Sequence, residues 1–223
     1  KLFPVSLQTK VAKSYDNSVT FSTQSPDRRW LLVAQPGQFT NYDVFDTANP
    51  EDGAKVIAIP GGILTQPVGS NQSMELVEWS NDNRHVVLKH TFNQSSEFIM
   101  FDRTDPLKSF NISTRIKQSA TQITLRDKKF NFLYIYDSTT RNLQLFDVEA
   151  GQLKSILSGV VEYKTYQDDV IMYTTQDQAE PGTVAVRMLE GERNYLLRIS
   201  KEGPVLLEMA AYDNAIYNAV SSV

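Results

Sequence analysis

The sequence predicts an all-β protein: a β-propeller or partial propeller with about four to five four-stranded blades. Short apolar runs of strand length alternate with polar turns along the chain. The dipeptide Phe-Asp closes three of these runs, at 45–46, 101–102 and 146–147, each time 19 or 20 residues after a turn that contains Asp. These turns recur at intervals of 55, 45 and 41 residues. Blades of four short strands repeat every 40–45 residues or so, and helical periodicity is nearly missing here.

The second unit shows the pattern most clearly. Apolar runs at 76–79, 85–91 and 97–101 are separated by the polar turns 80–84 and 93–96. A fourth strand is expected at 107–112. Such a unit cannot bury its faces alone, so it needs neighbours of the same kind.

The other units repeat this order. In the first unit, where Pro and Asp mark the turn at 25–29, strands are expected at 18–22, 30–34, 39–45 and 55–59. In the third they are expected at 121–125, 132–136, 142–146 and 153–157. In the fourth they are expected at 160–166, 170–175, 183–189 and 195–199, with further runs at 205–209 and 215–220.

These units predict a single propeller-like domain over residues 1–223. Its blades are expected at about 18–60, 74–113, 119–158 and 160–209. Residues 1–17, with a strand near 4–7 or 10–12, and residues 210–223 are expected to contribute to a further blade. Either the N-terminal strands complete the last blade, or the chain is part of a longer array. An open array leaves strand edges that invite association.

Composition narrows the function classes. A hydrophobic content of 41% with 10% aromatic residues supports a sizeable core. The net charge of −4, without basic runs, argues against nucleic acid and anionic membranes as partners. Cysteine is absent, which excludes disulfides and thiolate chemistry. Apolar runs are far shorter than the roughly 20 residues that span a bilayer, so no membrane contact is expected within this segment. The chain starts without Met or a signal-peptide pattern, as a segment of a longer protein would.

Two turns carry a family resemblance. The sequences SPDRRW at 25–30 and WSNDNR at 79–84 resemble the Trp-Ser-Pro-Asp-Gly-Lys turn of TolB-type, WD-like propeller repeats. The third turn, 125–129, is degenerate, and the fourth keeps only two Asp residues at 168–169. Arg28 and Asn83 stand where the family has Gly. Asn adopts left-handed conformations readily, whereas Arg does so at a cost.

The last third of the chain carries a narrower resemblance. The sequences EYKTY at 162–166, MYTT at 172–175 and AYDN at 211–214 resemble the propeller-like C-terminal region of bacterial membrane-anchored PEGA-domain proteins. No PEGA module is visible in this sequence. The resemblance implies an extracytoplasmic position on a bacterial cell surface and a membrane anchor elsewhere in the full protein. Periplasmic or cytoplasmic positions are the alternatives.

Catalytic and metal-binding patterns are weak. His85 and His90 are the only histidines, and five positions along one strand place them on opposite faces, which suits neither a Ser-His-Asp triad nor a zinc site. Asp43–Asp46 and Asp137–Thr140 contain oxygen ligands without an EF-hand pattern. No nucleotide-binding fingerprint occurs. We therefore expect no cofactor, no metal and no catalytic residue.

Paired carboxylates are the alternative to that expectation, because glycosidases use two of them. Glu75, Glu78 and Glu162 lie on expected first strands or their loops, near a propeller axis. An enzyme that acts on carbohydrate through such axial residues is the second hypothesis. The Asp residues that recur at 46, 102 and 147 are instead expected to accept hydrogen bonds from the next turn, because a catalytic group is needed once and not in every blade.

The favoured hypothesis is a non-enzymatic binding or scaffold module. It would engage a protein or cell-wall polymer through loops on one propeller face, where binding residues commonly lie. The residues predicted to bind the partner lie in or beside the loops between second and third strands: Phe39, Phe92, Gln94, Thr140, Arg141 and Gln178.

Overall fold

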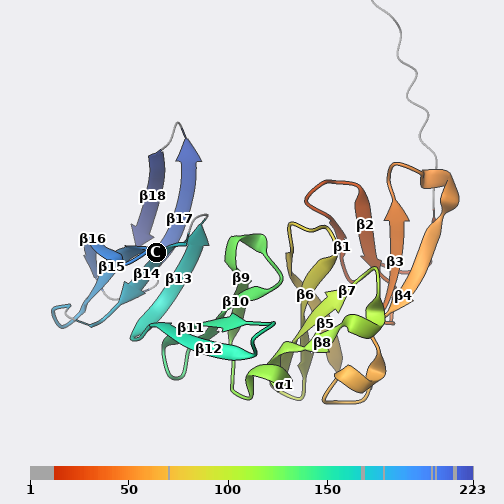
Figure 1. Ribbon diagram of the computed structural model, residues 1–223, viewed down its shortest axis with the longest axis horizontal. Coiled ribbons are helices and arrows are strands. Elements are labelled where there is room, and N and C mark those ends of the chain that lie inside the picture. Colours follow the sequence, from red (N-terminus) through yellow and green to blue (C-terminus); the bar gives the residue numbers. More distant parts are fainter. Residues whose placement is uncertain are drawn as a thin grey trace, which may run out of the picture. The chain divides into compact units, whose positions relative to one another are not determined.

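The computed structural model describes residues 13–69, 71–166, 169–177, 179–201, 203, 205–212 and 215–222. These residues form four four-stranded sheets and a two-stranded hairpin, and the strands of each sheet pair in chain order (Figure 1). The expected strand near 4–7 or 10–12 lies outside the described residues. The prediction of an all-β fold is confirmed.

The first sheet contains β1 (Ser22–Gln24), β2 (Trp30–Ala34), β3 (Asn41–Asp46) and β4 (Ala54–Ala58). A 3₁₀ turn, η1 (Pro50–Asp52), lies between the last two strands, and η2 (Gly61–Ile63) follows β4. The expected first strand at 18–22 is wrong in position. The chain comes alongside β2 only at Phe21, whose carbonyl accepts the N–H of Ala34 at 3.0 Å, so the strand forms later.

The second sheet contains β5 (Gln72–Trp79), β6 (His85–Phe92), β7 (Ser95–Asp102) and the short β8 (Phe110–Asn111). The fourth strand expected at 107–112 is largely wrong. Pro106 instead opens a 3₁₀ turn, η3 (Pro106–Lys108), because proline fixes φ and has no N–H for a ladder. The side chain of Asn111 then caps the helix α1 (Ile112–Ile116) by accepting the N–H of Thr114.

The third and fourth sheets match the sequence closely. The third contains β9 (Gln122–Leu125), β10 (Phe132–Asp137), β11 (Asn142–Asp147) and β12 (Gln152–Leu157), with η4 (Arg126–Lys128) after its first strand. The fourth contains β13 (Val160–Tyr166), β14 (Val170–Thr175), β15 (Thr183–Glu190) and β16 (Arg193–Lys201). The hairpin of β17 (Val205–Tyr212) and β18 (Ala215–Ser222) follows. The runs expected at 205–209 and 215–220 fall inside its two strands.

Contacts divide the chain into two compact units, and whether all sheets form one domain stays a prediction. The first unit comprises Lys1–Ser96 and Met100–Phe110. In it Tyr42 packs against Phe101 with ring centroids 5.3 Å apart, and Trp79 Nε1 donates to Thr23 Oγ1 at 3.1 Å. The first two sheets therefore share a core.

The second unit comprises Glu97–Ile99 and Asn111–Val223. Tyr136 and Tyr163 meet with ring centroids 5.4 Å apart, and the Tyr136 hydroxyl lies 2.9 Å from the carbonyl oxygen of Val160. Val205 and Leu207 of β17 belong to a cluster with core residues of the fourth sheet. The third sheet, the fourth sheet and the hairpin thus pack as successive layers of this unit.

Two left-handed residues stand where the TolB-type turn has glycine. Arg28 has a φ of 62° and Asn83 a φ of 58°. Both side chains stand at the fourth position of their turns, so the sequence-based expectation of a left-handed residue there is confirmed. Among the described residues, no helix has both the length and the apolar character that crossing a membrane requires.

Candidate functional site

The turns between the first and second strands of the first two sheets are built alike. Asp27 Oδ1 accepts the N–H of Arg29 at 3.0 Å. In the second sheet Asp82 Oδ1 accepts the N–H groups of Arg84 and His85 at 2.9 and 3.0 Å. A short acidic side chain thus closes each turn on its own backbone, which explains why Asp recurs there.

The Asp residues that close third strands also bond to the backbone that follows them. Asp46, Asp102 and Asp147 each accept the N–H two positions on, at 3.0, 2.9 and 3.0 Å. Asp102 and Asp147 accept a second N–H, three positions on, at 3.0 and 2.9 Å. The expectation that these carboxylates are structural is confirmed.

Two of these carboxylates also bind arginine, which the sequence analysis missed. Arg29 Nη2 lies 2.9 Å from Asp46 Oδ2, and Arg84 Nε lies 2.8 Å from Asp102 Oδ1. Hydrogen bonds from Arg29 hold the pKa of Asp46 well below its usual range. Burial acts to raise the pKa of Asp102, but the hydrogen bonds it accepts, first from Arg84, outweigh burial and lower it strongly.

The signal for these pairs was present in the sequence. The turns 25–29 and 80–84 both end in Arg, 17 or 18 residues before the closing Asp. The third sheet has Lys129 at the corresponding place, and its Nζ lies 3.6 Å from Asp127 Oδ2. The bidentate pair therefore belongs to the two well-formed turns, since the planar arginine fork fits a carboxylate and lysine does not.

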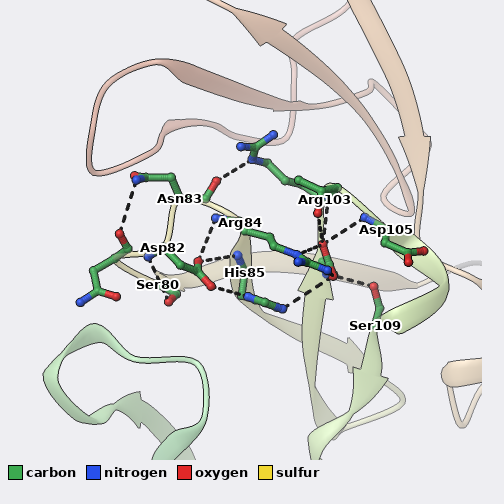
Figure 2. Close-up of polar contacts among 11 residues, drawn as sticks. Ser80, Asp82, Asn83, Arg84, His85, Arg103, Asp105 and Ser109 are labelled. Atoms are coloured by element: carbon green, nitrogen blue, oxygen red, sulfur yellow. Dashed lines mark hydrogen bonds and ion pairs between the residues drawn. The ribbon is translucent and has the colours of Figure 1, made fainter.

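His85 lies in the middle of this network. Its Nδ1 is 2.5 Å from Asp82 Oδ2, and its Nε2 is 3.7 Å from Asp102 Oδ2. Figure 2 shows His85 beside Asp82 and Arg84, with Ser109 and Asp105 approaching from the segment after β7. His85 as a whole is only 9% exposed. Both ring nitrogens face carboxylates, and the geometry is that of a structural clamp.

The predicted partner-binding residues of the first unit are partly brought together. Phe39 and Phe92 both pack against the buried ring of His90, at centroid distances of 5.5 and 4.8 Å. Phe92 is itself 9% exposed, so its ring belongs to the core. Gln94 is exposed at the tip of the turn between β6 and β7, with a φ of 64°.

In the second unit, two loops between second and third strands touch. Thr140 and Arg141 are exposed in the turn after β10. Arg141 Nη1 donates to Gln176 Oε1 in the loop after β14 at 2.7 Å. Gln178 lies outside the described residues. The assignment of all six residues to a binding site stays a prediction.

A concave site opens beside the loop between β2 and β3. It has a volume of about 310 Å³ and is lined by Lys13, Tyr15 and Gln35 among others. Beneath it Asp43 is fully buried and accepts from Lys13 Nζ and the Tyr15 hydroxyl, each at 2.5 Å, and from Gln35 Nε2 at 2.9 Å. Burial acts to raise the pKa of Asp43, but these donors outweigh it and lower the pKa. Asp43 thus holds the segment that begins at residue 13 against the first sheet.

The carboxylates considered for catalysis lie on the first strands of two sheets, one in each unit. Glu75 and Glu78 lie on β5, where the register shift between Leu76 and Glu78 pairs them with Lys89 and Val87 and so places both on the same face of the sheet. Glu162 is exposed on β13, in the second unit. Among the described residues, no group of three or more His, Asp or Glu side chains is placed to hold a metal ion.

In the first unit, the two ends of the sheets differ in whether their loops have matching lengths. Because the strands are antiparallel, the turns after the first and third strands lie at one end and the turn after the second strand lies at the other. At one end the loops match in length, 25–29 with 80–84 and 47–53 with 103–109. At the other end the loops differ in length, because loop 35–40 of the first sheet corresponds to the much shorter loop 93–94 of the second. One end is therefore a repeated framework and the other varies.

Comparison with solved structures shows which known folds this chain resembles. The uncharacterized protein lmo1340 of Listeria monocytogenes EGD-e superposes with a TM-score of 0.59 and 11% identity, over 87% of this chain and 61% of that one. An oligogalacturonate lyase in complex with manganese superposes with a TM-score of 0.53 and 12% identity, over 80% of this chain and 52% of the lyase. The fold is of the β-propeller type.

At these identities the likeness concerns the fold alone. TolB from Acinetobacter baumannii is a more distant match, with a TM-score of 0.43 and 10% identity over 76% of this chain and 40% of that one. The chain spans 61% and 52% of the lengths of the first two structures. No protein-family model and no curated protein matches the sequence.

Proposed function

We propose that this chain is a non-enzymatic binding module that engages a protein or cell-wall polymer through the loops between second and third strands. The observation that carries the proposal is the contrast between the two ends of the sheets. Loops 35–40 and 93–94 differ in length, whereas the loops at the opposite end of the same sheets match. A rigid framework that carries variable loops is the usual construction of a binding surface.

The chemistry of the framework end supports this assignment. The recurrent carboxylates Asp46, Asp102 and Asp147 are committed to backbone N–H groups, and two of them also to arginine. Gln94 is exposed at the varying end of the first unit, and Thr140 and Arg141 are exposed in the loop between second and third strands of a sheet in the second unit. They can bind a polar partner without distorting the turns.

We also propose that the module is displayed outside the cytoplasm on a bacterial cell surface, as part of a longer, membrane-anchored protein. The sequence resemblance to TolB-type repeats and to the propeller-like region of PEGA-domain proteins supports this placement. Periplasmic display is compatible with the same binding role.

Binding of the fluorescently labelled chain to purified bacterial cell-wall sacculi tests the proposal. The sacculi are used both before and after protease removes their attached proteins. We expect saturable binding without release of reducing sugar. Loss of binding after protease treatment identifies a protein partner, and its persistence identifies the polymer.

Matched variants locate the binding face. Arg141→Ala and Gln94→Ala each remove an exposed side chain from a loop between second and third strands, and Glu149→Ala removes one from the loop 148–151 between a third and a fourth strand. We expect the first two to weaken binding several-fold and the third to leave it unchanged. No binding to either preparation contradicts the module. Sugar release that Glu78→Gln abolishes establishes the carbohydrate-active enzyme instead.

A further inference from the structure

A polar pocket in the second unit has the character of a ligand site. It has a volume of about 280 Å³ and lies where the end of β12 meets the fourth sheet. Ile156 and Leu157 line it from β12, Tyr173 from β14, and Asp177 from the loop between second and third strands. Ile156, Leu157 and Asp177 therefore border the pocket at the end of the sheets that carries the loops between second and third strands. Its volume is near the lower limit of ligand pockets, about 300 Å³, which suits a single ring.

The position of Asp177 is set by a glycine. Gly159 has a φ of 68°, and a Cβ added to it would lie 2.2 Å from Asp177 Oδ2 and 2.7 Å from Asp177 Cγ. The carboxylate therefore rests directly on the glycine backbone. The N–H of Asp177 donates to Thr175 Oγ1 at 3.1 Å, which fixes the start of the loop.

The hydroxyl of Tyr173 is a second polar group of the pocket, and a hydrogen bond fixes its position. Asn194 Nδ2 donates to the hydroxyl oxygen of Tyr173 at 2.7 Å, and Tyr173 is 3% exposed. Because this hydroxyl already accepts a hydrogen bond, its own proton remains to be donated. Among the described residues, none donates a hydrogen bond to the Asp177 carboxylate. The pocket thus presents a fixed acceptor and a fixed donor.

We propose that this pocket binds one neutral sugar ring of a polysaccharide. Sugar hydroxyls both donate and accept, so one can donate to Asp177 while another accepts from Tyr173. Ile156 and Leu157 supply an apolar wall for the C–H face of the ring. The proposal rests on the proposed function and specifies its ligand as a polymer.

Charge favours a sugar over a peptide. Asp177 and Arg187 give the lining one acidic and one basic side chain, so it selects for neither an anion nor a cation. Arg187 also has an interaction within the protein, which a peptide carboxylate would have to displace. A neutral polyhydroxyl ligand requires no such displacement.

Titration of the ¹⁵N-labelled chain, followed by amide chemical shifts, tests this site. The probes are cellotetraose, tetra-N-acetylchitotetraose and, as the competing class, tetra-alanine. We expect at least one tetrasaccharide to shift the amide signals of Gly159, Asp177 and Asn194. Asp177→Asn should raise its Kd about tenfold, as loss of one hydrogen bond to a charged group predicts.

Two glycine variants separate the contact from backbone strain. Gly159→Ala should also raise the Kd about tenfold, because the new methyl group displaces the Asp177 carboxylate. Gly151→Ala is the control: its φ is 66°, nothing lies within 4 Å of the added Cβ, and the Kd should not change. Asp177→Asn alters an exposed side chain and keeps the test valid if Gly159→Ala fails to fold.

Several outcomes would overturn the sugar site. They are binding of tetra-alanine alone, binding of neither class, or tetrasaccharide binding that neither Asp177→Asn nor Gly159→Ala changes. If sacculi still bind and Arg141→Ala still weakens that binding, the sugar site fails while the binding module stands. If sacculi do not bind at all, the module itself fails.

Discussion

Asp102 shows how one side chain can close a strand and anchor a turn. It is fully buried, and it accepts hydrogen bonds from Arg84 and from the backbone N–H groups of Thr104 and Asp105. Because its pKa is lowered on folding, it contributes stability above its ordinary pKa of about 3.9. That contribution is lost as the pH falls below this value toward the folded pKa.

Asp102→Asn isolates the charge, because the amide oxygen can still accept backbone hydrogen bonds. We expect the free energy of unfolding at pH 7 to fall by about 2 kcal/mol, since Arg84 loses its carboxylate partner. The difference from the unchanged chain should shrink below pH 4 or so, where Asp102 begins to bind a proton in the unfolded state while it stays ionised in the folded one. Urea denaturation at pH 7 and pH 3 measures it. Asp147→Asn is the control, and an equal loss there would contradict the role given to arginine.

Arg28 occupies a left-handed position that glycine fills at lower cost. Its φ is 62°, a conformation that costs an L-residue about 1–2 kcal/mol. Arg28→Gly should therefore raise the free energy of unfolding, by about 0.5 kcal/mol after the extra chain entropy of glycine is counted. Urea denaturation measures the gain, and a loss would contradict it.

Asn83→Gly is the matched comparison. Asn83 has a φ of 58°, and its Oδ1 accepts the N–H of Asp27 at 2.9 Å. Removing this side chain relieves little strain, because Asn tolerates the conformation, and it breaks a contact between the first two turns. We expect no gain in stability from this variant.

At the scale of elements, α1 depends on a residue that serves two partners. Asn111 Oδ1 accepts the N–H of Thr114 at 2.9 Å, and Asn111 Nδ2 donates to Glu97 Oε2 at 2.6 Å. Glu97 is 2% exposed, so loss of the Asn111 donor would leave a buried carboxylate oxygen without this hydrogen bond. The same side chain thus ends β8, begins the helix and holds β7.

Two substitutions at this position separate its two bonds. Asn111→Ala removes both and should lower the free energy of unfolding by about 2 kcal/mol. Asn111→Asp keeps the cap but sets a second carboxylate beside Glu97, so it should be at least as destabilising at pH 7 and recover at low pH. Adding Glu97→Gln to Asn111→Asp should restore stability at pH 7. Thermal unfolding at both pH values checks this, and failure of the rescue would refute the direct contact.

At the scale of the whole molecule, β16 is an exposed edge. It pairs with β15, and Tyr195, Leu196, Leu197 and Ile199 are between 37% and 53% exposed. A long apolar edge strand promotes association between chains. We expect sedimentation velocity to show association that grows with protein concentration.

A single charge should suppress this association. Leu197→Lys places a cation on the edge strand, a common protection against edge pairing, and should lower the associated fraction without changing the thermal midpoint. Val56→Lys alters a residue that is 57% exposed on β4 and serves as the control. A chain that stays monomeric at every concentration would contradict the prediction.

Local patterns in the sequence determined the strands and their turns. Alternating apolar residues and turn-forming Asp, Pro and Asn act over a few positions, so the strands of the third and fourth sheets and the roles of Asp46, Asp102 and Asp147 could be predicted. The Pro106 turn and the Asn111 cap were also local signals. The apolar residues around them led instead to the prediction of a strand at 107–112.

Only the tertiary structure decided which distant side chains meet. Arg29 with Asp46, Arg84 with Asp102, and Asn111 with Glu97 are separated by 14 to 18 residues. The close contact between the Asp177 carboxylate and Gly159 depends on how the segment between β12 and β13 meets the loop after β14. Strand register and sheet packing set these contacts, and both arise from burial summed over whole sheets, which no single stretch of sequence encodes.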